Sequence, residues 1–283
     1  MKKWIYIFIA LVPSIAYADD VSSLFAAAQS ACTETHQGLE KIKTLMGVST
    51  GASAVGTVTS GTALVTGLAK AKTDKELAKM TAEDLYKYAE ELEETMVKLN
   101  EERAELEKKS KTLGNVRTGM MAASTATSVT SAATSGATIK MFEDTLNNMH
   151  NCQTLSMQLG DQKTDDDNML RKIKLVKMRC SDFDYDNITK IKKLATANTG
   201  VATAGAATGL FGTIASALAN SERTRGDDTF AGMKKEKNLN TGANIAAGVT
   251  TATSLTSVVL SGSALSNLKR NAQNAADCVK AFQ

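Results

Sequence analysis

Long uncharged stretches alternate with charged segments along this chain. The uncharged stretches are residues 45–69, 120–139, 194–219 and 239–267. Each is rich in Ala, Val, Ser, Thr and Gly, and the chain's one proline, Pro13, precedes them all. Because proline is the strongest helix breaker, stretches of this length without it predict helices. We therefore expect an all-α protein.

These stretches repeat each other in two pairs. Residues 39–51 align with residues 188–200 at an offset of 149, and residues 125–136 align with residues 251–262 at an offset of 126. A repeat of this kind is typical of a duplicated supersecondary unit. The sequence therefore predicts two tandem antiparallel helical hairpins, which we call the first and second repeats.

Small residues dominate the expected helices. Glycines recur every three to five residues in the first helix of each repeat: Gly47, Gly51, Gly56, Gly61, Gly200, Gly205, Gly209 and Gly212. Since a glycine inside a helix costs about 1 kcal/mol against alanine, so many of them indicate close packing of helix on helix. In composition these helix cores resemble the glycine-zipper segments of bacterial envelope proteins. The resemblance implies small-residue packing between Gly, Ala, Ser and Thr.

The first eighteen residues have the features of a bacterial secretory signal peptide. Lys2 and Lys3 precede an apolar run at 4–12, and Ala16–Ala18 forms a small-residue cleavage site. The apolar run is shorter than the roughly 20 residues that a transmembrane helix needs. We expect residues 1–18 to be removed and the rest to be exported to the periplasm or beyond.

The repeats and the signal peptide divide the chain into four parts. Residues 1–18 are the signal peptide, and residues 19–152 form the first repeat. Residues 153–179 form a polar linker loop and a short basic amphipathic helix, and residues 180–283 form the second repeat.

The charge balance limits the classes of partner. The chain carries 33 Lys and Arg against 30 Asp and Glu, and the signal peptide contributes two of the lysines and no acid. A nearly neutral chain with mixed charges argues against a nucleic acid as partner. The sequence also holds no nucleotide-binding loop and no G-x-S-x-G motif. We expect no enzyme activity, no cofactor and no small-molecule substrate.

Four cysteines follow the signal peptide: Cys32, Cys152, Cys180 and Cys278. An even number in an exported chain indicates disulfides, for which three pairings exist. Each repeat begins and ends near a cysteine, so an antiparallel hairpin brings its own two cysteines together. We therefore favour Cys32–Cys152 and Cys180–Cys278, whereas the alternative Cys152–Cys180 would join the two repeats.

The two histidines of the chain lie close to cysteines of the first repeat. Cys32, His36, His150 and Cys152 are residue types that hold zinc in tetrahedral sites. The exported compartment is oxidising, and the second repeat has no histidine beside its cysteines. We therefore favour disulfides with bystander histidines and expect no metal site.

The first repeat contains a charged extension at about 74–113. Leucines recur in it every seven residues: Leu85, Leu92, Leu99, Leu106 and Leu113. Such spacing with flanking Glu and Lys is typical of a coiled-coil seam. The seam either packs on its own hairpin partner or docks a second copy or another protein. The sequence leaves open whether this extension is one helix or a hairpin.

The uncharged stretches have two interpretations. They are long enough to span a bilayer, yet nearly half of each is Ser, Thr, Gly or Asn. We favour soluble packing and expect an exported, non-catalytic structural or protein-interaction protein of the bacterial envelope that associates with itself or with another protein. The alternative is a membrane-active protein whose uncharged helices insert and assemble into a pore.

Overall fold

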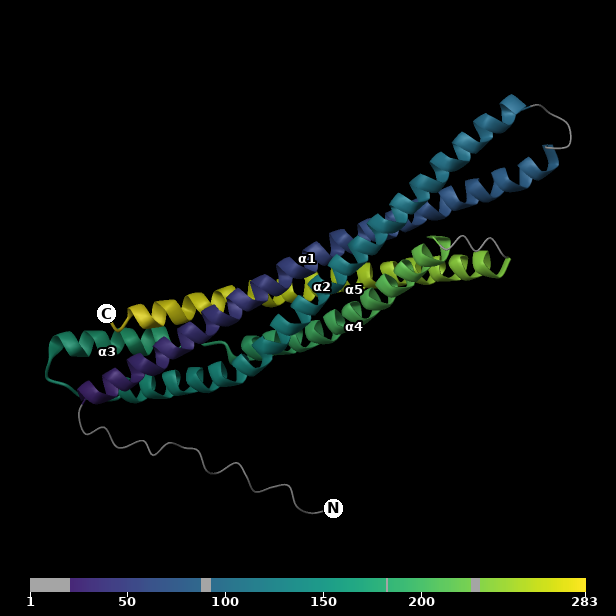
Figure 1. Cartoon of the computed structure of the whole chain (residues 1–283). Helices are drawn as coiled ribbons and strands as arrows, with labels where there is room; N and C mark the ends of the chain where they lie inside the picture. The colour runs from purple at the N-terminus through teal and green to yellow at the C-terminus, as the bar shows by residue number, and fades with distance from the viewer. Residues whose placement is uncertain (1–20, 88–92, 182, 225–229) are drawn as a thin grey trace, which may run out of the picture. The chain divides into compact units, whose positions relative to one another are not determined.

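The computed structural model describes residues 21–87, 93–181, 183–224 and 230–283. It contains the helices α1 (Val21–Lys87), α2 (Glu93–Gly160), α3 (Asp167–Cys180), α4 (Tyr185–Thr224) and α5 (Phe230–Lys280). No strand occurs among these residues, which confirms the predicted all-α fold (Figure 1). The predicted signal peptide lies outside the described residues.

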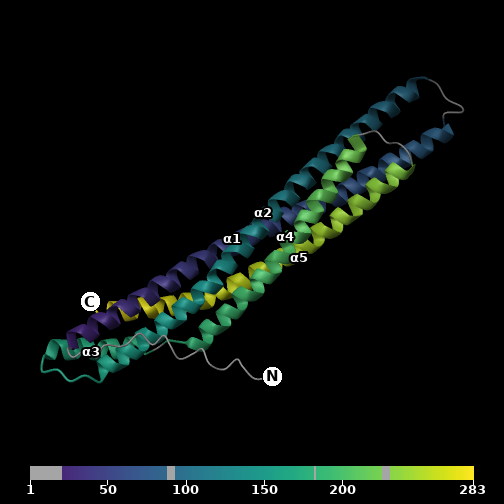
Figure 2. The same ribbon diagram turned by 60° about the horizontal axis from the view of Figure 1, so that its bottom comes forward.

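The long helices pack as two hairpins. Figures 1 and 2 show α1 beside α2 and α4 beside α5. Because α1 ends at Lys87 and α2 begins at Glu93, the charged extension contains two helices. This answers the question that the sequence left open, because the extension is not one helix: α1 and α2 lie side by side along it, and residues 88–92 between them are outside the described part.

The chain forms two compact units. Unit 1 contains the described residues up to Lys43 together with Lys140–Thr189 and Asn267–Gln283, and unit 2 contains Thr44–Ile139 and Lys190–Ser266. Each unit therefore takes segments from both repeats. The division of the chain into two repeats at 19–152 and 180–283 comes from the sequence pattern, and it stays a prediction.

The helix seam of unit 2 is made of small polar residues. On α2 the buried positions recur every three or four residues: Ser124, Ser128, Ser131, Ser135 and Thr138. An alternation of three and four residues keeps one helix face toward its neighbours over many turns. Buried Ser, Asn, Gly and Ala occupy the same spacing on α4, so this core has few large side chains.

Gly56 shows how closely the helices approach each other. A Cβ atom on Gly56 would lie 2.8 Å from Thr127 Oγ1 and 3.2 Å from Ser254 Oγ. The first neighbour belongs to α2 and the second to α5, so α1 is in contact with both helices at this level. A side chain at this position would have to displace one of them.

Gly205 has matching surroundings in the second repeat. A Cβ atom there would lie 2.8 Å from Thr253 Oγ1 and 3.3 Å from Ser128 Oγ. Thr253 follows Thr127 by 126 residues, which is the offset of the sequence repeat. Equivalent residues of the two repeats thus occupy equivalent places in unit 2.

Unit 1 has a more conventional apolar core. Its fully buried residues include Leu39, Ile42, Phe142, Met149, Leu159, Ile173 and Ile188. The rings of Phe25 and Phe282 meet edge to face with centroids 5.2 Å apart. This contact ties the end of the chain to the start of α1.

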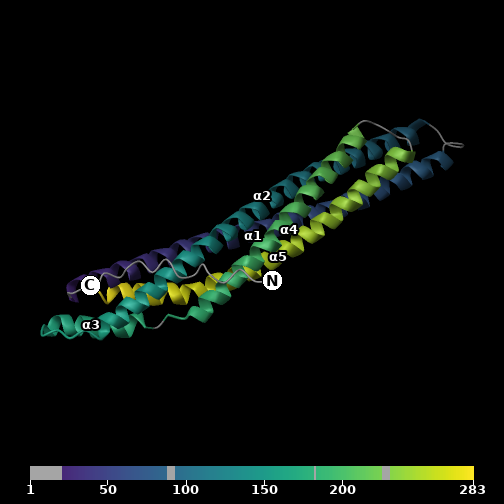
Figure 3. The same ribbon diagram turned by 90° about the horizontal axis from the view of Figure 1, so that it is seen from below.

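The short helix α3 completes unit 1 (Figure 3). Asp166 caps it, because its carboxylate accepts hydrogen bonds from the backbone amides of Asn168 and Met169 at 2.9 and 3.3 Å. Its apolar face is buried, and Gly160 at the end of α2 leaves room for the side chain of Lys177. The basic helix predicted between the repeats therefore packs on its neighbours.

A pair of glycine substitutions tests the close packing of unit 2. We expect Gly56→Ala to lower the midpoint of thermal unfolding, followed by circular dichroism, because the added methyl group meets Thr127. Gly61→Ala is the matched control, since nothing lies within 4 Å of its added Cβ. It should stabilise α1 by about 1 kcal/mol through helix propensity. Equal effects of the two changes would contradict the packing.

Candidate functional site

All four cysteines meet in the interior of unit 1. Disulfides join Cys32 to Cys152 and Cys180 to Cys278, with Cα atoms 4.7 and 4.8 Å apart. These are the pairs that the sequence favours over Cys152–Cys180. Each of the four side chains is at most 1% exposed.

The two disulfides lie against each other. Cys152 Sγ is 3.8 Å from Cys278 Sγ, and all four sulfur atoms lie within 4.8 Å of one another. Cys32 Sγ also lies 3.6 Å from the hydroxyl of Ser156. The sequence predicts the pairs but not this cluster, because it does not show how the second repeat is placed against the first.

The histidines do not take part in this cluster. His150 is exposed, and His36 is partly buried with no hydrogen-bond partner for its Nδ1 among the described residues. Within the described part of the chain, the potential metal ligands that come together are the four cysteines alone. The candidate zinc set of Cys32, His36, His150 and Cys152 is therefore not assembled here.

A hydrogen-bond network of buried side chains fills unit 2. Asn198 donates to Ser49 Oγ at 3.0 Å and to Ser135 Oγ at 2.6 Å, and its carbonyl accepts from Ser257 at 2.5 Å. These four residues come from four different helices. The amide of one residue therefore connects the whole cross-section of the bundle.

A second hub lies at Ser131. Its hydroxyl is 2.9 Å from that of Ser49, 2.8 Å from that of Ser53 and 3.2 Å from that of Ser257. Burying a hydroxyl without a partner costs about 1–3 kcal/mol, so a network that satisfies these groups fixes the register of the helices.

Substitution of the first hub should be costly. We expect Asn198→Ala to lower the free energy of unfolding by about 2–3 kcal/mol, because three hydroxyls lose a partner inside the bundle. Thr203→Ala is the control, since Thr203 is exposed on the same helix and its hydroxyl donates to the carbonyl of Thr199 on that helix. The free energy of unfolding of both variants is measured by denaturant titration, and Thr203→Ala should change it by no more than about 0.5 kcal/mol.

Charged residues are buried where the extension joins the bundle. Lys70 is 1% exposed, and its ammonium group lies 2.7 Å from Asp74 Oδ2 and 3.1 Å from Glu236 Oε1. Asp74 also accepts a hydrogen bond from Ser110 on α2. The buried cation is thus matched by carboxylates from two helices, as a buried charge requires.

Arg117 lies fully buried in the same region. Its guanidinium donates to Ser216 at 2.9 Å, to Asn244 at 3.1 Å and to Asn240 at 2.6 Å. Burial lowers the pKa of Arg117, and the negative charges of Asp74 and Glu236 oppose that shift. The polar groups around Lys70 and Arg117 bond to one another across helices, so we assign them a structural role.

The predicted leucine seam is only partly described. Leu99, Leu106 and Leu113 are half-buried on α2, while Leu92 and the side chain of Leu85 lie outside the described part. The Ser110 hydroxyl, on the same part of α2, is bonded to Asp74 of α1. This contact favours packing of the seam on its hairpin partner, and docking of another protein there stays a prediction.

The exterior of unit 2 is apolar along the uncharged stretches. Exposed positions within residues 45–69, 118–139, 194–219 and 239–266 hold Ala, Val, Leu, Ile, Phe, Gly and Thr, together with two serines, Ser263 and Ser266, at the end of the last stretch. The larger ones are Val48, Val55, Val58, Val65, Leu68, Val129, Leu210, Phe211, Ile214, Leu218, Ile245, Val249, Leu255 and Val259. Most large apolar side chains of these stretches therefore lie outside, although Met46 and Met121 are buried, and the small polar side chains lie inside.

The threonines of this exterior turn their hydroxyls back to the helix. Thr59, Thr62, Thr130, Thr203 and Thr256 each donate to the carbonyl four residues earlier, at 2.8–3.0 Å. A hydroxyl that is bonded in this way needs no water molecule. The methyl group of each threonine then adds to the apolar surface.

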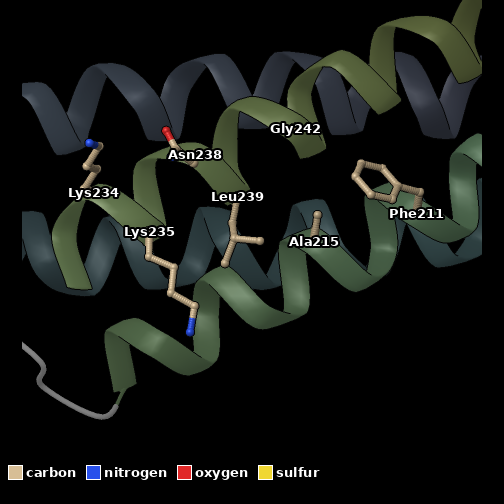
Figure 4. A pocket seen from close by; sticks show the side chains of 7 residues that line it. All are labelled: Phe211, Ala215, Lys234, Lys235, Asn238, Leu239 and Gly242. Atoms are coloured by element: carbon tan, nitrogen blue, oxygen red, sulfur yellow. The ribbon is translucent and has the colours of Figure 1, made fainter. Parts of the chain in front are cut away.

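A shallow hollow of about 440 Å³ lies between α4 and α5 in unit 2 (Figure 4). Its lining is formed by Phe211, Ala215, Leu239 and Gly242, with Lys234, Lys235 and Asn238 at one end. The lining is mainly aliphatic and aromatic, so it continues the apolar exterior.

Within the part of the chain that the structure describes, three stretches of helix are apolar enough, by length and composition, to cross a membrane: Val21–Met80, Tyr185–Ser221 and Lys234–Lys280. Comparison with known proteins found no matching family model, no similar curated protein and no similar solved structure. Any conclusion about function therefore depends on the residues of this chain.

Proposed function

We propose that this chain is an exported, non-catalytic structural protein of a bacterial envelope, and that the uncharged stretches of unit 2 lie within a lipid bilayer. One observation carries the proposal: serines and Asn198 are buried inside unit 2, while valines, leucines and Phe211 are exposed on it. Soluble bundles show the opposite arrangement. In a membrane, small and polar residues pack between helices and apolar side chains face the lipid.

The length of the uncharged stretches supports this placement. Residues 45–69 and 118–139 carry no charged side chain. At 1.5 Å per residue they extend over roughly 33–38 Å, which covers the hydrocarbon core of about 30 Å. Along the chain, Lys43 and Lys70 flank the first stretch, and Arg117 and Lys140 flank the second. Charges at both ends of an apolar segment are typical of a membrane span.

The signal-like residues 1–18 and the two disulfides support export. Disulfides persist in oxidising compartments such as the periplasm. This favours an envelope membrane that borders an oxidising compartment. The buried charged residues and the cysteines support a structural role. In the described part of the chain, they bond to other residues of the bundle.

A pore-forming protein is the second candidate, and the same apolar exterior supports it. Insertion is the step that both functions share. The hydroxyls of Ser49 and Ser131 and the amide of Asn198 are bonded to each other inside the bundle. A pore would therefore have to form between several copies rather than through one.

Substitution of one exposed residue by lysine tests whether this surface faces lipid or water. Val58 is 69% exposed near the middle of its uncharged stretch. In a bilayer, Val58→Lys should cost about 2.5–3.5 kcal/mol and reduce the fraction of protein that stays in carbonate-washed membranes. In water it should leave both solubility and stability nearly unchanged.

Val97→Lys is the matched control, because Val97 is 56% exposed and lies on the charged extension. It should leave membrane retention as in the unchanged protein. Recovery of the unchanged protein in the carbonate supernatant would refute the bilayer placement.

Vesicle leakage distinguishes the two candidates. A structural protein that spans the bilayer should remain in vesicles without releasing a trapped dye. Release that rises steeply with protein concentration would replace the structural proposal by the pore, because assembly of several copies is then the active step.

A further inference from the structure

The four-cysteine cluster of unit 1 supports an inference that is independent of the membrane. We propose that the reduced protein binds one zinc ion through Cys32, Cys152, Cys180 and Cys278. The same buried place would then hold unit 1 together in two redox states, by two disulfides or by one metal ion.

The spacing of the sulfur atoms carries this proposal. Zinc binds thiolates tetrahedrally at about 2.3 Å, which places neighbouring sulfurs roughly 3.8 Å apart. Cys152 Sγ and Cys278 Sγ, which belong to different disulfides, are 3.8 Å apart, and all four sulfurs lie within 4.8 Å. After reduction, mainly the two bonded pairs must separate to reach the tetrahedral arrangement.

The backbone around the cluster allows such a movement. The cysteines come from α1, α2, α3 and α5, so one ligand is supplied by each of four helices. Cys180 is the last residue of α3, and Cys278 lies close to the end of α5 at Lys280. Helix ends shift more easily than helix centres, since fewer backbone hydrogen bonds hold them.

The chemistry of the cluster selects the metal. Four thiolates form a soft ligand set, which suits zinc and not magnesium or calcium. The site is buried, and the Ser156 hydroxyl near Cys32 Sγ is placed to donate a hydrogen bond to a thiolate ligand. Neutralisation by a divalent cation also removes much of the cost of buried thiolates.

The exchange between the two states is balanced. Two molecules of a dithiol reductant each reduce one disulfide, so four protein thiols form and both reductants become disulfides. Binding of one Zn²⁺ by four thiolates then releases four protons. In the reverse direction, two molecules of a cyclic disulfide oxidant accept the four electrons and four protons and become dithiols, while the four thiolates become two disulfides and the ion is freed.

Cobalt is the spectroscopic probe for this site. Detergent-solubilised protein without residues 1–18 is reduced with a phosphine, which is removed under anaerobic conditions, and Co²⁺ is then added. We expect the visible bands and the thiolate charge-transfer band of tetrahedral cobalt to saturate at one equivalent. Zn²⁺ should abolish these bands, and the oxidised protein should show none.

Two variants identify the ligands. Cys278→Ser should lose the four-thiolate spectrum, because one ligand is missing. The double variant His36→Ala with His150→Ala should retain the full spectrum, since neither histidine belongs to the cluster. Loss of the spectrum in the histidine variant and its persistence in Cys278→Ser would overturn the assignment.

Circular dichroism shows whether the reduced protein is still helical, so that a missing cobalt spectrum can be interpreted. If the reduced protein stays helical but shows no tetrahedral cobalt spectrum, the proposal is wrong. If reduction unfolds unit 1, one equivalent of Zn²⁺ must restore the lost helix, and failure to do so also refutes the site. None of these results depends on where unit 2 lies, because the protein is held in detergent.

Discussion

The structure depends on one constraint, which is that the buried hydroxyls at the centre of the unit 2 core share hydrogen bonds from one helix to another. Ser131 alone meets Ser49, Ser53 and Ser257. Leucine in such a seam would tolerate small shifts, since apolar contacts have no direction. Hydrogen bonds are directional and short, so displacement of one helix by a single turn would leave several buried hydroxyls unpaired. The core therefore fixes the register of the helices more strictly than its small apolar area suggests.

Because serine and glycine fill much of the core of unit 2, most of its larger apolar side chains lie on its exterior. Helices that approach as closely as α1 and α2 do at Gly56 leave no space between them for a valine or leucine. These larger side chains are consequently on the outer faces, where Val58 and Phe211 lie. In water this exterior would be a large exposed apolar patch, which soluble monomers rarely carry. The bilayer proposal thus follows from the same constraint as the packing.

The sequence predicted the fold class, because it lacks proline after Pro13 and repeats itself at two offsets. It does not by itself indicate the seam of unit 2, because sevenfold spacing is typical of a helix seam when the residues are apolar, as with Leu99 and its neighbours in the heptads. The same spacing was present in the serines of the repeated segment at 125–136, but hydroxyl residues are usually taken as exposed. The contact between the disulfides was also beyond prediction, because it depends on how two separately predicted hairpins pack.

The repeat explains why partners in both units are so often equivalent residues. Ser131 meets Ser257 in unit 2, and Cys152 approaches Cys278 in unit 1, in each case at an offset of 126. Two identical serines that face each other can share only one hydrogen bond. Ser49 faces Asn198 at the other repeat offset, and there the two residues differ. The amide supplies two donors and one acceptor, so it satisfies three hydroxyls that a second serine would leave incomplete. The network is therefore complete because Asn198, and not a second serine, occupies the position that corresponds to Ser49.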